Sequence, residues 1–292
     1  MPLPAIELHG HRGARGLWPE NTIPGFRGAI GIGVTAIEMD VALTQDGVAI
    51  LSHDPILDPL ITRGPDGAWI AAPGGLIRDL SYVEASGFDV GRIRPGSAQE
   101  AAFPDQAGLD GVRLPMLSDV VALDPAVRLA VELKTFPDHP ERTVPPDEMV
   151  DAVLAVLDHQ DALSRTRIIS FDWRVLSYLR RVRPGLDLGY LTDAETRAAD
   201  RLWWDGASAD DCGGSIPRLI ASRGGRVWGP DFRDLTEADV AEAHDLGIVV
   251  NPWTVNEAED MARLLDWGVG ALTTDYPDRA RAVMAAKGIA LA

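Results

Sequence analysis

Short apolar runs typical of β-strands alternate with helix-like segments along this chain, and this alternation restricts the fold more than any other feature. The helix-like segments carry N-capping residues at their starts and glycines at their ends. Eight strands are predicted, over residues 6–9, 36–44, 127–134, 167–171, 186–191, 226–230, 248–255 and 269–274. Eight successive strand–helix units in 292 residues predict an α/β fold of the (β/α)₈ TIM-barrel type.

The second predicted strand carries two acids on one face. Glu38 and Asp40 are two residues apart, and side chains two apart on a strand point the same way. Asp46-Gly47 is a strong hairpin signal, so residues 48–53 are predicted to fold back against this strand. That turn would bring His53 roughly opposite Asp40.

Residues 55–114 break the regular pattern, because glycine, proline and aspartate are frequent there and one short helix is predicted around residues 81–86. A structureless loop of that length would be unusual inside a compact domain. We therefore predict a single catalytic domain over residues 1–292, in which residues 55–114 (the insertion) follow the hairpin and cap the C-terminal rim of the barrel.

Composition restricts the partners and the compartment. The formal net charge of −17 would oppose binding to nucleic acid or to an anionic membrane surface. Cys212 is the only cysteine, and neither a leader-like start nor an apolar run of spanning length is present in the sequence. We expect a cytoplasmic protein without stable membrane anchoring. The sequence carries no signal for an oligomeric state.

A second pair of charged residues repeats the two-residue spacing. Glu132 and Lys134 end the third predicted strand, where apolar neighbours indicate burial. A salt bridge on a solvated strand face is the plain alternative for such a pair. With Glu38 and Asp40, however, Glu132 would complete a carboxylate set suited to a hard divalent cation, and Lys134 would face the same cavity as a phosphate contact.

Two histidines and an arginine are the other candidates for chemistry. His11 and His53 would converge on the carboxylates, and acid–base catalysis near neutral pH needs two groups of suitable pKa. Arg12 offers a planar fork of donors that fits a phosphate. We assign no functional role to the remaining histidines or to one nearby arginine: His9, His139, His159, His244 and Arg15.

The ordered set of motifs resembles the glycerophosphodiester phosphodiesterase family of the phospholipase C-like phosphodiesterase superfamily. The resemblance runs from about residue 8 to residue 280. Its motifs are His11-Arg12-Gly13, Pro19-Glu20-Asn21-Thr22, Glu38-x-Asp40-Val41, Thr44-x-Asp46-Gly47, His53-Asp54, Glu132-x-Lys134, Ser170-Phe171, Trp253-Thr254-Val255-Asn256 and Thr274-Asp275-Tyr276-Pro277.

This resemblance implies a TIM barrel that hydrolyses glycerophosphodiesters to glycerol 3-phosphate and an alcohol. It implies Mg²⁺ or Ca²⁺ held by Glu38, Asp40 and Glu132. It further implies general acid–base catalysis by His11 and His53, with phosphate bound by Arg12 and Lys134. Phe171 and Trp253 would line the alcohol pocket, although core packing is an alternative for both. Glu20 and Asn21 would support the site or the start of a helix.

Several alternatives stay open at this point. The attacking oxygen could belong to the substrate's glycerol, through a cyclic phosphate, or to water, and the two histidines could exchange the roles of acid and base. The same site could act on lysophospholipids or on another phosphodiester, which a long apolar groove in the insertion would favour. A barrel that binds a phosphorylated ligand without catalysis is the alternative of a different class.

Overall fold

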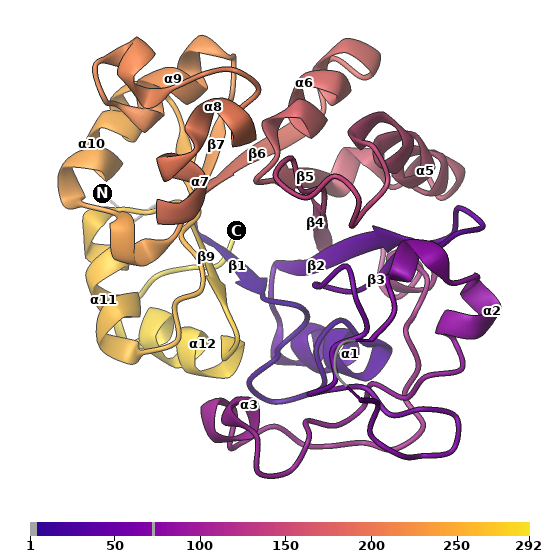
Figure 1. Ribbon diagram of the computed structural model, residues 1–292. Helices are drawn as coiled ribbons and strands as arrows, with labels where there is room; N and C mark the ends of the chain where they lie inside the picture. The colour runs from indigo at the N-terminus through magenta and orange to yellow at the C-terminus, as the bar shows by residue number, and fades with distance from the viewer. Residues whose placement is uncertain (1–4, 72–73) are drawn as a thin grey trace.

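The computed structural model describes residues 5–71 and 74–292, and over these residues eight parallel strands form a barrel surrounded by helices (Figure 1). The neighbours in the sheet follow the order β8-β7-β6-β5-β4-β2-β1-β9. The strands are β1 Glu7–Gly10, β2 Ala36–Leu43, β4 Arg128–Leu133, β5 Thr166–Ser170, β6 Asp187–Thr192, β7 Val227–Pro230, β8 Val249–Val250 and β9 Ala271–Thr274.

Backbone hydrogen bonds join β8 and the segment after it to β9, although the two strands form no regular ladder. The amide of Gly270 donates to the carbonyl of Val250 at 3.1 Å, and the amide of Thr273 donates to the carbonyl of Pro252 at 3.1 Å. The amide of Val255 returns a bond to the carbonyl of Thr273 at 3.0 Å. The barrel is therefore nearly closed, and the predicted (β/α)₈ fold is confirmed.

Helices lie between the strands, as the alternation of strand-like and helix-like segments predicts. The helices outside the insertion are α1 Ile23–Ile32, α4 Leu117–Val121, α5 Pro146–His159, α6 Trp173–Val182, α7 Ala194–Ala198, α8 Asp200–Trp203, α9 Ile216–Ser222, α10 Glu237–Asp245, α11 Ala258–Trp267 and α12 Pro277–Ala286. One side of α5 packs in the main core, next to α4 and α6, and it consists of Met149, Val150, Val153, Leu154 and Leu157.

Side-chain caps fix several helix starts, as the sequence predicts. Thr22 caps α1 by accepting a hydrogen bond from the amide of Gly25, and Asp172 caps α6. The spacing of Asn256 and Glu259 in the sequence predicts a capping box for α11, and this prediction is wrong. The N-cap of α11 is Glu257, which makes no side-chain cap. The side chain of Asn256 is hydrogen-bonded to Thr274 and Asp275 instead.

The predicted hairpin is present as β3 Ala49–Leu51, which pairs antiparallel with β2 and stands outside the barrel order. The register pairs Val41 with Leu51, and the amide of Ser52 donates to the carbonyl of Asp40 at 3.0 Å. His53 therefore lies one residue beyond the position opposite Asp40, at the rim of the barrel.

The insertion packs against this hairpin. Its loops and short helices are the purple to magenta segment at the bottom and right of Figure 1. It contains η1 Ile77–Asp79, α2 Tyr82–Ala85 and α3 Ala98–Ala102. Its small apolar core joins Leu57, Ile77, Ala85, Val90 and Leu114 to Ala42 and Ile50 of the hairpin. The predicted short helix around 81–86 is thus α2, with a capping box from Ser81 to Glu84. The helix α3 was not predicted, and it lies nearest to the site.

The main core fills the space between the strands and the outer helices, and the largest buried side chains include Trp173, Trp204 and Phe26. Inside the barrel, Ala130, Ile169 and Leu191 form a small apolar cluster beneath the rim. Among the residues the structure describes, no helix is both long and apolar enough to cross a bilayer.

Candidate active site

A cavity of about 470 Å³ opens at the C-terminal ends of the barrel strands. Polar side chains from the β1, β2 and β4 ends line one wall, and they are His11, Arg12, Glu38, His53, Glu132 and Lys134. Apolar and aromatic side chains line the opposite wall, and they include Ile169, Phe171, Leu191, Phe232 and Trp253. All the residues predicted to bind the metal or the substrate, or to act in catalysis, line this cavity, apart from Asp40, which lies buried beside it.

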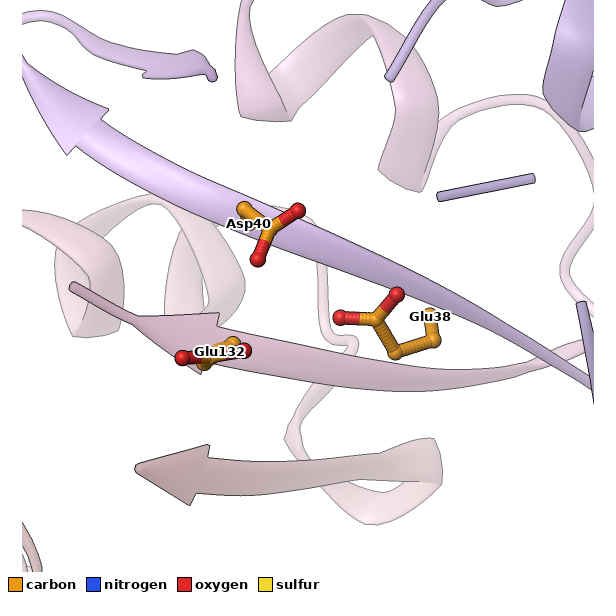
Figure 2. Close-up of side chains that lie close together, drawn as sticks. All are labelled: Glu38, Asp40 and Glu132. Atoms are coloured by element: carbon orange, nitrogen blue, oxygen red, sulfur yellow. The ribbon is translucent and has the colours of Figure 1, made fainter. Parts of the chain in front are cut away.

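Three buried carboxylates converge at the polar wall (Figure 2). Glu38 and Asp40 lie on β2, and Glu132 lies on β4 next to it. One oxygen of each lies within 4.8 Å of the others. The ladder pairs Asp40 with Glu132, so the parallel register itself brings the third acid to the first two.

The three buried carboxylates repel one another, because little water is present to screen their charges. Burial, with the neighbouring charges of Asp40 and Glu132, raises the pKa of Glu38 well above its usual range. Burial likewise raises the pKa of Glu132 to about 7, although Lys134 opposes the shift. Burial also disfavours the charged form of Asp40, but Lys134 and Arg12 outweigh it and hold the pKa of Asp40 well below its usual range.

The carboxylate cluster fits a divalent cation. Oxygen ligands of this kind suit Mg²⁺ and Ca²⁺, and a divalent charge would relieve the repulsion that raises the pKa of Glu38. In addition, Oδ1 of Asp40 is buried and accepts no hydrogen bond within the described part of the chain, although Nζ of Lys134 lies 3.0 Å away. A buried carboxylate oxygen that accepts no hydrogen bond can instead serve as a ligand of a metal ion.

Two cations are held against these acids. Nζ of Lys134 lies 2.6 Å from Glu132 Oε1, so the ion pair considered as the plain alternative does form, but it is buried and faces the cavity. Arg12 donates from Nη1 to Glu20 at 2.9 Å, and its Nε lies 3.3 Å from Asp40 Oδ2. Both cations can therefore reach an anion bound over the carboxylates.

The loop after β1 presents Arg12 through an unusual backbone. Arg12 has a φ of 49°, a left-handed conformation that is rare outside glycine. Its amide donates to Glu38 Oε2 at 2.8 Å, and its carbonyl accepts from the amide of Asn21 at 2.9 Å. Gly13 follows at a φ of 89°, where a Cβ atom would lie 2.8 Å from the backbone of Gly25.

Glu20 and Asn21 support the site by direct contact, which is one of the two roles predicted for them. Besides the Glu20–Arg12 pair, Asn21 Nδ2 donates to Asp40 Oδ2 at 2.9 Å, and Asn21 Oδ1 accepts from the Asp40 amide at 3.2 Å. Asn21 thereby fixes which oxygen of Asp40 is left for another partner.

Both candidate histidines contact a carboxylate through Nδ1. His11 Nδ1 lies 2.6 Å from Asp275 Oδ1, and His53 Nδ1 lies 2.8 Å from Asp54 Oδ1. Burial lowers the pKa of His11 despite the charge of Asp275, and burial with the charges of Arg12 and Lys134 lowers the pKa of His53 to about 4. Both shifts favour the uncharged imidazole.

Phe171 and Trp253 both pack on the core inside the barrel and line the cavity, which are the two roles predicted for them. Their rings meet edge to face, with centroids 5.4 Å apart, and they pack on the small cluster inside the barrel. Trp253 is anchored by a hydrogen bond from Nε1 to the carbonyl of Gly229 at 2.9 Å. Both side chains also line the cavity, so packing and lining are one arrangement.

Comparison with known proteins agrees with this geometry. The Glycerophosphoryl diester phosphodiesterase family matches the chain over residues 11–279. The chain belongs to this family. The resemblance in the sequence motifs is confirmed, and so is the expectation of an enzyme of this family.

Individual relatives give the same result. A glycerophosphodiester phosphodiesterase of Bacillus subtilis is 28% identical over 277 residues, which are 92% of this chain and 83% of the relative. A provisionally named family structure from Silicibacter pomeroyi is 37% identical, with a TM-score of 0.90, and the match covers 100% of this chain and 97% of that one. An Oleispira antarctica phosphodiesterase, solved in complex with its product sn-glycerol-3-phosphate, shares the fold at 22% identity, with a TM-score of 0.70 and 97% of each chain covered.

Sequence reasoning missed some residues of this family member's cavity. Arg15, which received no role, lines the cavity together with Phe103 of the insertion and with Asn256 and Asp275. The position of Asp275 just after the last strand was a usable signal, since the active sites of such barrels lie at that end. Phe103 offered no signal, because the insertion has no periodic pattern.

The other histidines lie elsewhere, as expected. His9 points to the opposite end of the barrel, where its Nε2 lies 3.0 Å from Glu7. His139, His159 and His244 are not among the cavity-lining residues.

Proposed function

We propose that this enzyme hydrolyses glycerophosphodiesters to glycerol 3-phosphate and an alcohol. The observation that carries the proposal is the convergence of three buried carboxylates, two histidines and Arg12 at one cavity. The named activity of the Bacillus subtilis relative supports it, and so does the glycerol 3-phosphate bound to the Oleispira antarctica protein.

Glu38, Asp40 and Glu132 would hold one Mg²⁺ or Ca²⁺ ion, which would supply positive charge to the phosphate oxygens. Arg12 and Lys134 would bind the non-bridging oxygens from the protein side. As negative charge grows on these oxygens in the transition state, the guanidinium and ammonium groups would stabilise it. Their present ion pairs hold both groups in place before the substrate arrives.

His11 and His53 would move the protons. Each has a carboxylate at Nδ1, which leaves Nε2 available to the cavity. One imidazole would take the proton of the attacking oxygen, and the other would protonate the departing alkoxide. The attacking oxygen belongs either to the substrate's glycerol or to water.

The test is hydrolysis of glycerophosphocholine and glycerophosphoethanolamine with and without EDTA. The quantity measured is the glycerol 3-phosphate released. We expect activity that EDTA abolishes and that Glu38→Ala and His53→Ala reduce by at least about 100-fold. His139→Ala is the matched control, since this histidine also contacts a carboxylate but lies outside the cavity. Full activity after chelation, or in either site variant, would contradict the proposal.

The apolar wall keeps a second substrate class open. Ile169, Leu191 and Val227 make the inner part of the cavity apolar, and such a wall also fits the chain of a lysophospholipid. We rank this alternative lower, because these residues come from barrel strands and not from a groove in the insertion. Lysophosphatidylcholine in the same assay would decide it. Binding of glycerol 3-phosphate without any turnover would instead support a non-catalytic phosphate binder.

Two further expectations remain proposals. We propose that the insertion belongs to one catalytic domain and covers the rim of the barrel, which Ala102 and Phe103 of the cavity wall support. The cytoplasmic location expected from the single cysteine also stays a prediction.

A further inference from the structure

We propose that Asp275 is a positioning residue for His11. Its carboxylate holds the imidazole in the form that carries hydrogen on Nδ1, so that Nε2 is free to accept a proton in the cavity. This inference rests on the proposed function in one respect, namely that His11 acts as a proton acceptor.

The barrel topology brings the two residues together. β1 pairs with β9 in parallel, with Gly10 opposite Thr274, so His11 and Asp275 are the next residues on two adjacent strands. The amide of His11 donates to the carbonyl of Thr274 at 2.9 Å, which fixes the backbone of the pair. The side chains then meet at 2.6 Å, with Asp275 fully buried.

Asp275 is itself held as an ionised carboxylate. Arg15 donates with a fork, from Nε to Oδ1 at 3.1 Å and from Nη2 to Oδ2 at 3.3 Å. Asn256 donates from Nδ2 to Oδ2 at 2.8 Å, while its own Oδ1 accepts from the amide of Asp275 at 3.0 Å. Burial opposes ionisation, but the contacts of His11 and Arg15 with the carboxylate outweigh it and lower the pKa of Asp275.

The tautomer of His11 follows from these contacts. An ionised carboxylate can only accept hydrogen bonds, so at 2.6 Å the Nδ1 atom of His11 must be the donor. Nε2 then carries a lone pair. It lies 3.9 Å from Glu38 Oε2, too far for a hydrogen bond, and the imidazole lines the cavity.

Two residues of the insertion contact Arg15 and thereby support this arrangement. The guanidinium of Arg15 lies over the ring of Phe103 at 4.5 Å from the centroid, and Gln106 Nε2 donates to the carbonyl of Arg15 at 2.7 Å. The contacts run from the insertion through Arg15 and Asp275 to His11. Arg15 thereby gains the role that its place in the sequence did not indicate.

Asp275→Asn tests the proposal with almost no change of shape. At Oδ2 the amide NH₂ would meet two groups that can only donate, Asn256 Nδ2 and Arg15 Nη2, whereas at Oδ1 it would meet one, Arg15 Nε. The amide NH₂ would therefore face His11, whose Nδ1 can change from donor to acceptor. Nδ1 would then have to accept, and the hydrogen would move to Nε2. Blocking the proton acceptor in this way should lower kcat by about 100-fold or more and leave KM within a few-fold.

The measurement is a long-range ¹H–¹⁵N spectrum of the metal-free protein with ¹⁵N-labelled histidine, in which His11→Gln identifies the signals of His11. We expect Nδ1 to be protonated in the wild type and Nε2 to be protonated in Asp275→Asn. Asp172→Asn is the matched control. Asp172 is equally buried and held by a similar fork from Arg174, but it contacts no histidine, so the His11 signals and kcat should not change.

Protonation of His11 on Nε2 in the wild type would overturn the proposal without any variant. An Asp275→Asn protein that keeps hydrogen on Nδ1, or that loses activity through KM alone, would also overturn it. If instead His11→Gln were fully active, the proposed function would fail, while the spectra would still decide whether Asp275 sets the tautomer.

Discussion

Asp40 and Glu132 are direct partners in the parallel ladder between β2 and β4, and Nζ of Lys134 lies 3.0 Å from the first and 2.6 Å from the second. Two carboxylates on adjacent strands therefore share one ammonium group. Glu38, two residues before Asp40 on β2, forms no ion pair with a lysine or arginine in the described part of the chain, and burial with the neighbouring acids raises its pKa. The three carboxylates therefore carry more negative charge than Lys134 compensates, and a further cation would be favoured there.

Replacing Glu132 by glutamine should weaken metal binding. The carboxylate would lose its charge, while the amide would keep the shape of the site. We expect the affinity for Mg²⁺ or Ca²⁺ to fall by more than about 10-fold, since even outer partners of metal ligands have effects of that size. Calorimetric titration of the metal-free protein measures it. Glu141→Gln, an exposed acid beside His139, should bind as the wild type does; equal affinity in both variants would remove Glu132 from the metal site.

Replacing Arg12 by lysine should lower activity although the charge is kept. The guanidinium contacts Glu20 and Asp40 with different nitrogen atoms, and an ammonium group cannot reproduce that fork. We expect kcat/KM for glycerophosphocholine to fall by about 10-fold to 100-fold. Arg113→Lys in the insertion, whose side chain donates to the carbonyl of Gly87, is the control. Unchanged kinetics in Arg12→Lys would argue against a phosphate contact.

Replacing Phe103 by alanine should weaken substrate binding more than it slows the chemistry. The variant would remove a cavity wall and the ring beneath Arg15, a contact worth about 0.5–1 kcal/mol. We expect KM to rise by about 2-fold to 5-fold, with a smaller change in kcat. Steady-state kinetics measure both. Val83→Ala, which shortens an exposed side chain elsewhere in the insertion, should change neither.

Replacing Glu7 by glutamine should lower stability near neutral pH. Glu7 lies 2.7 Å from Arg167 and 3.0 Å from His9 at the far end of the barrel. Burial alone would raise its pKa, but the hydrogen bond from His9 and the charge of Arg167 outweigh it and lower the pKa. The charged form therefore contributes stability above the unfolded-state pKa, of about 4.3, and that contribution disappears as the pH falls through the folded-state pKa.

We accordingly expect Glu7→Gln to reduce the free energy of unfolding by about 2 kcal/mol at pH 7, and by less at pH 4. Urea denaturation at the two pH values measures the difference. Glu257→Gln serves as the control, because Glu257 is exposed and lies 3.6 Å from Arg279. A deficit that grew towards acid pH would reverse the predicted sign.

Local pattern predicted much of the fold because strand and helix periodicities are set within a few residues. It failed where a side chain has a choice between local and distant partners. Asn256 was expected to cap α11, but its amide binds Asp275 after β9 instead. Arg15 received no role for the same reason, since Asp275 and Phe103 lie far from it along the chain.

The sequence alone determined which strands exist and which side chains share a face, because alternation along a strand is a property of the backbone itself. It thereby determined that Glu38 and Asp40 point the same way. The tertiary structure decided that Glu132 lies across from Asp40 and that Asp275 meets His11. Those contacts depend on which strands become neighbours and in what register, and only closure of the barrel around its core sets both.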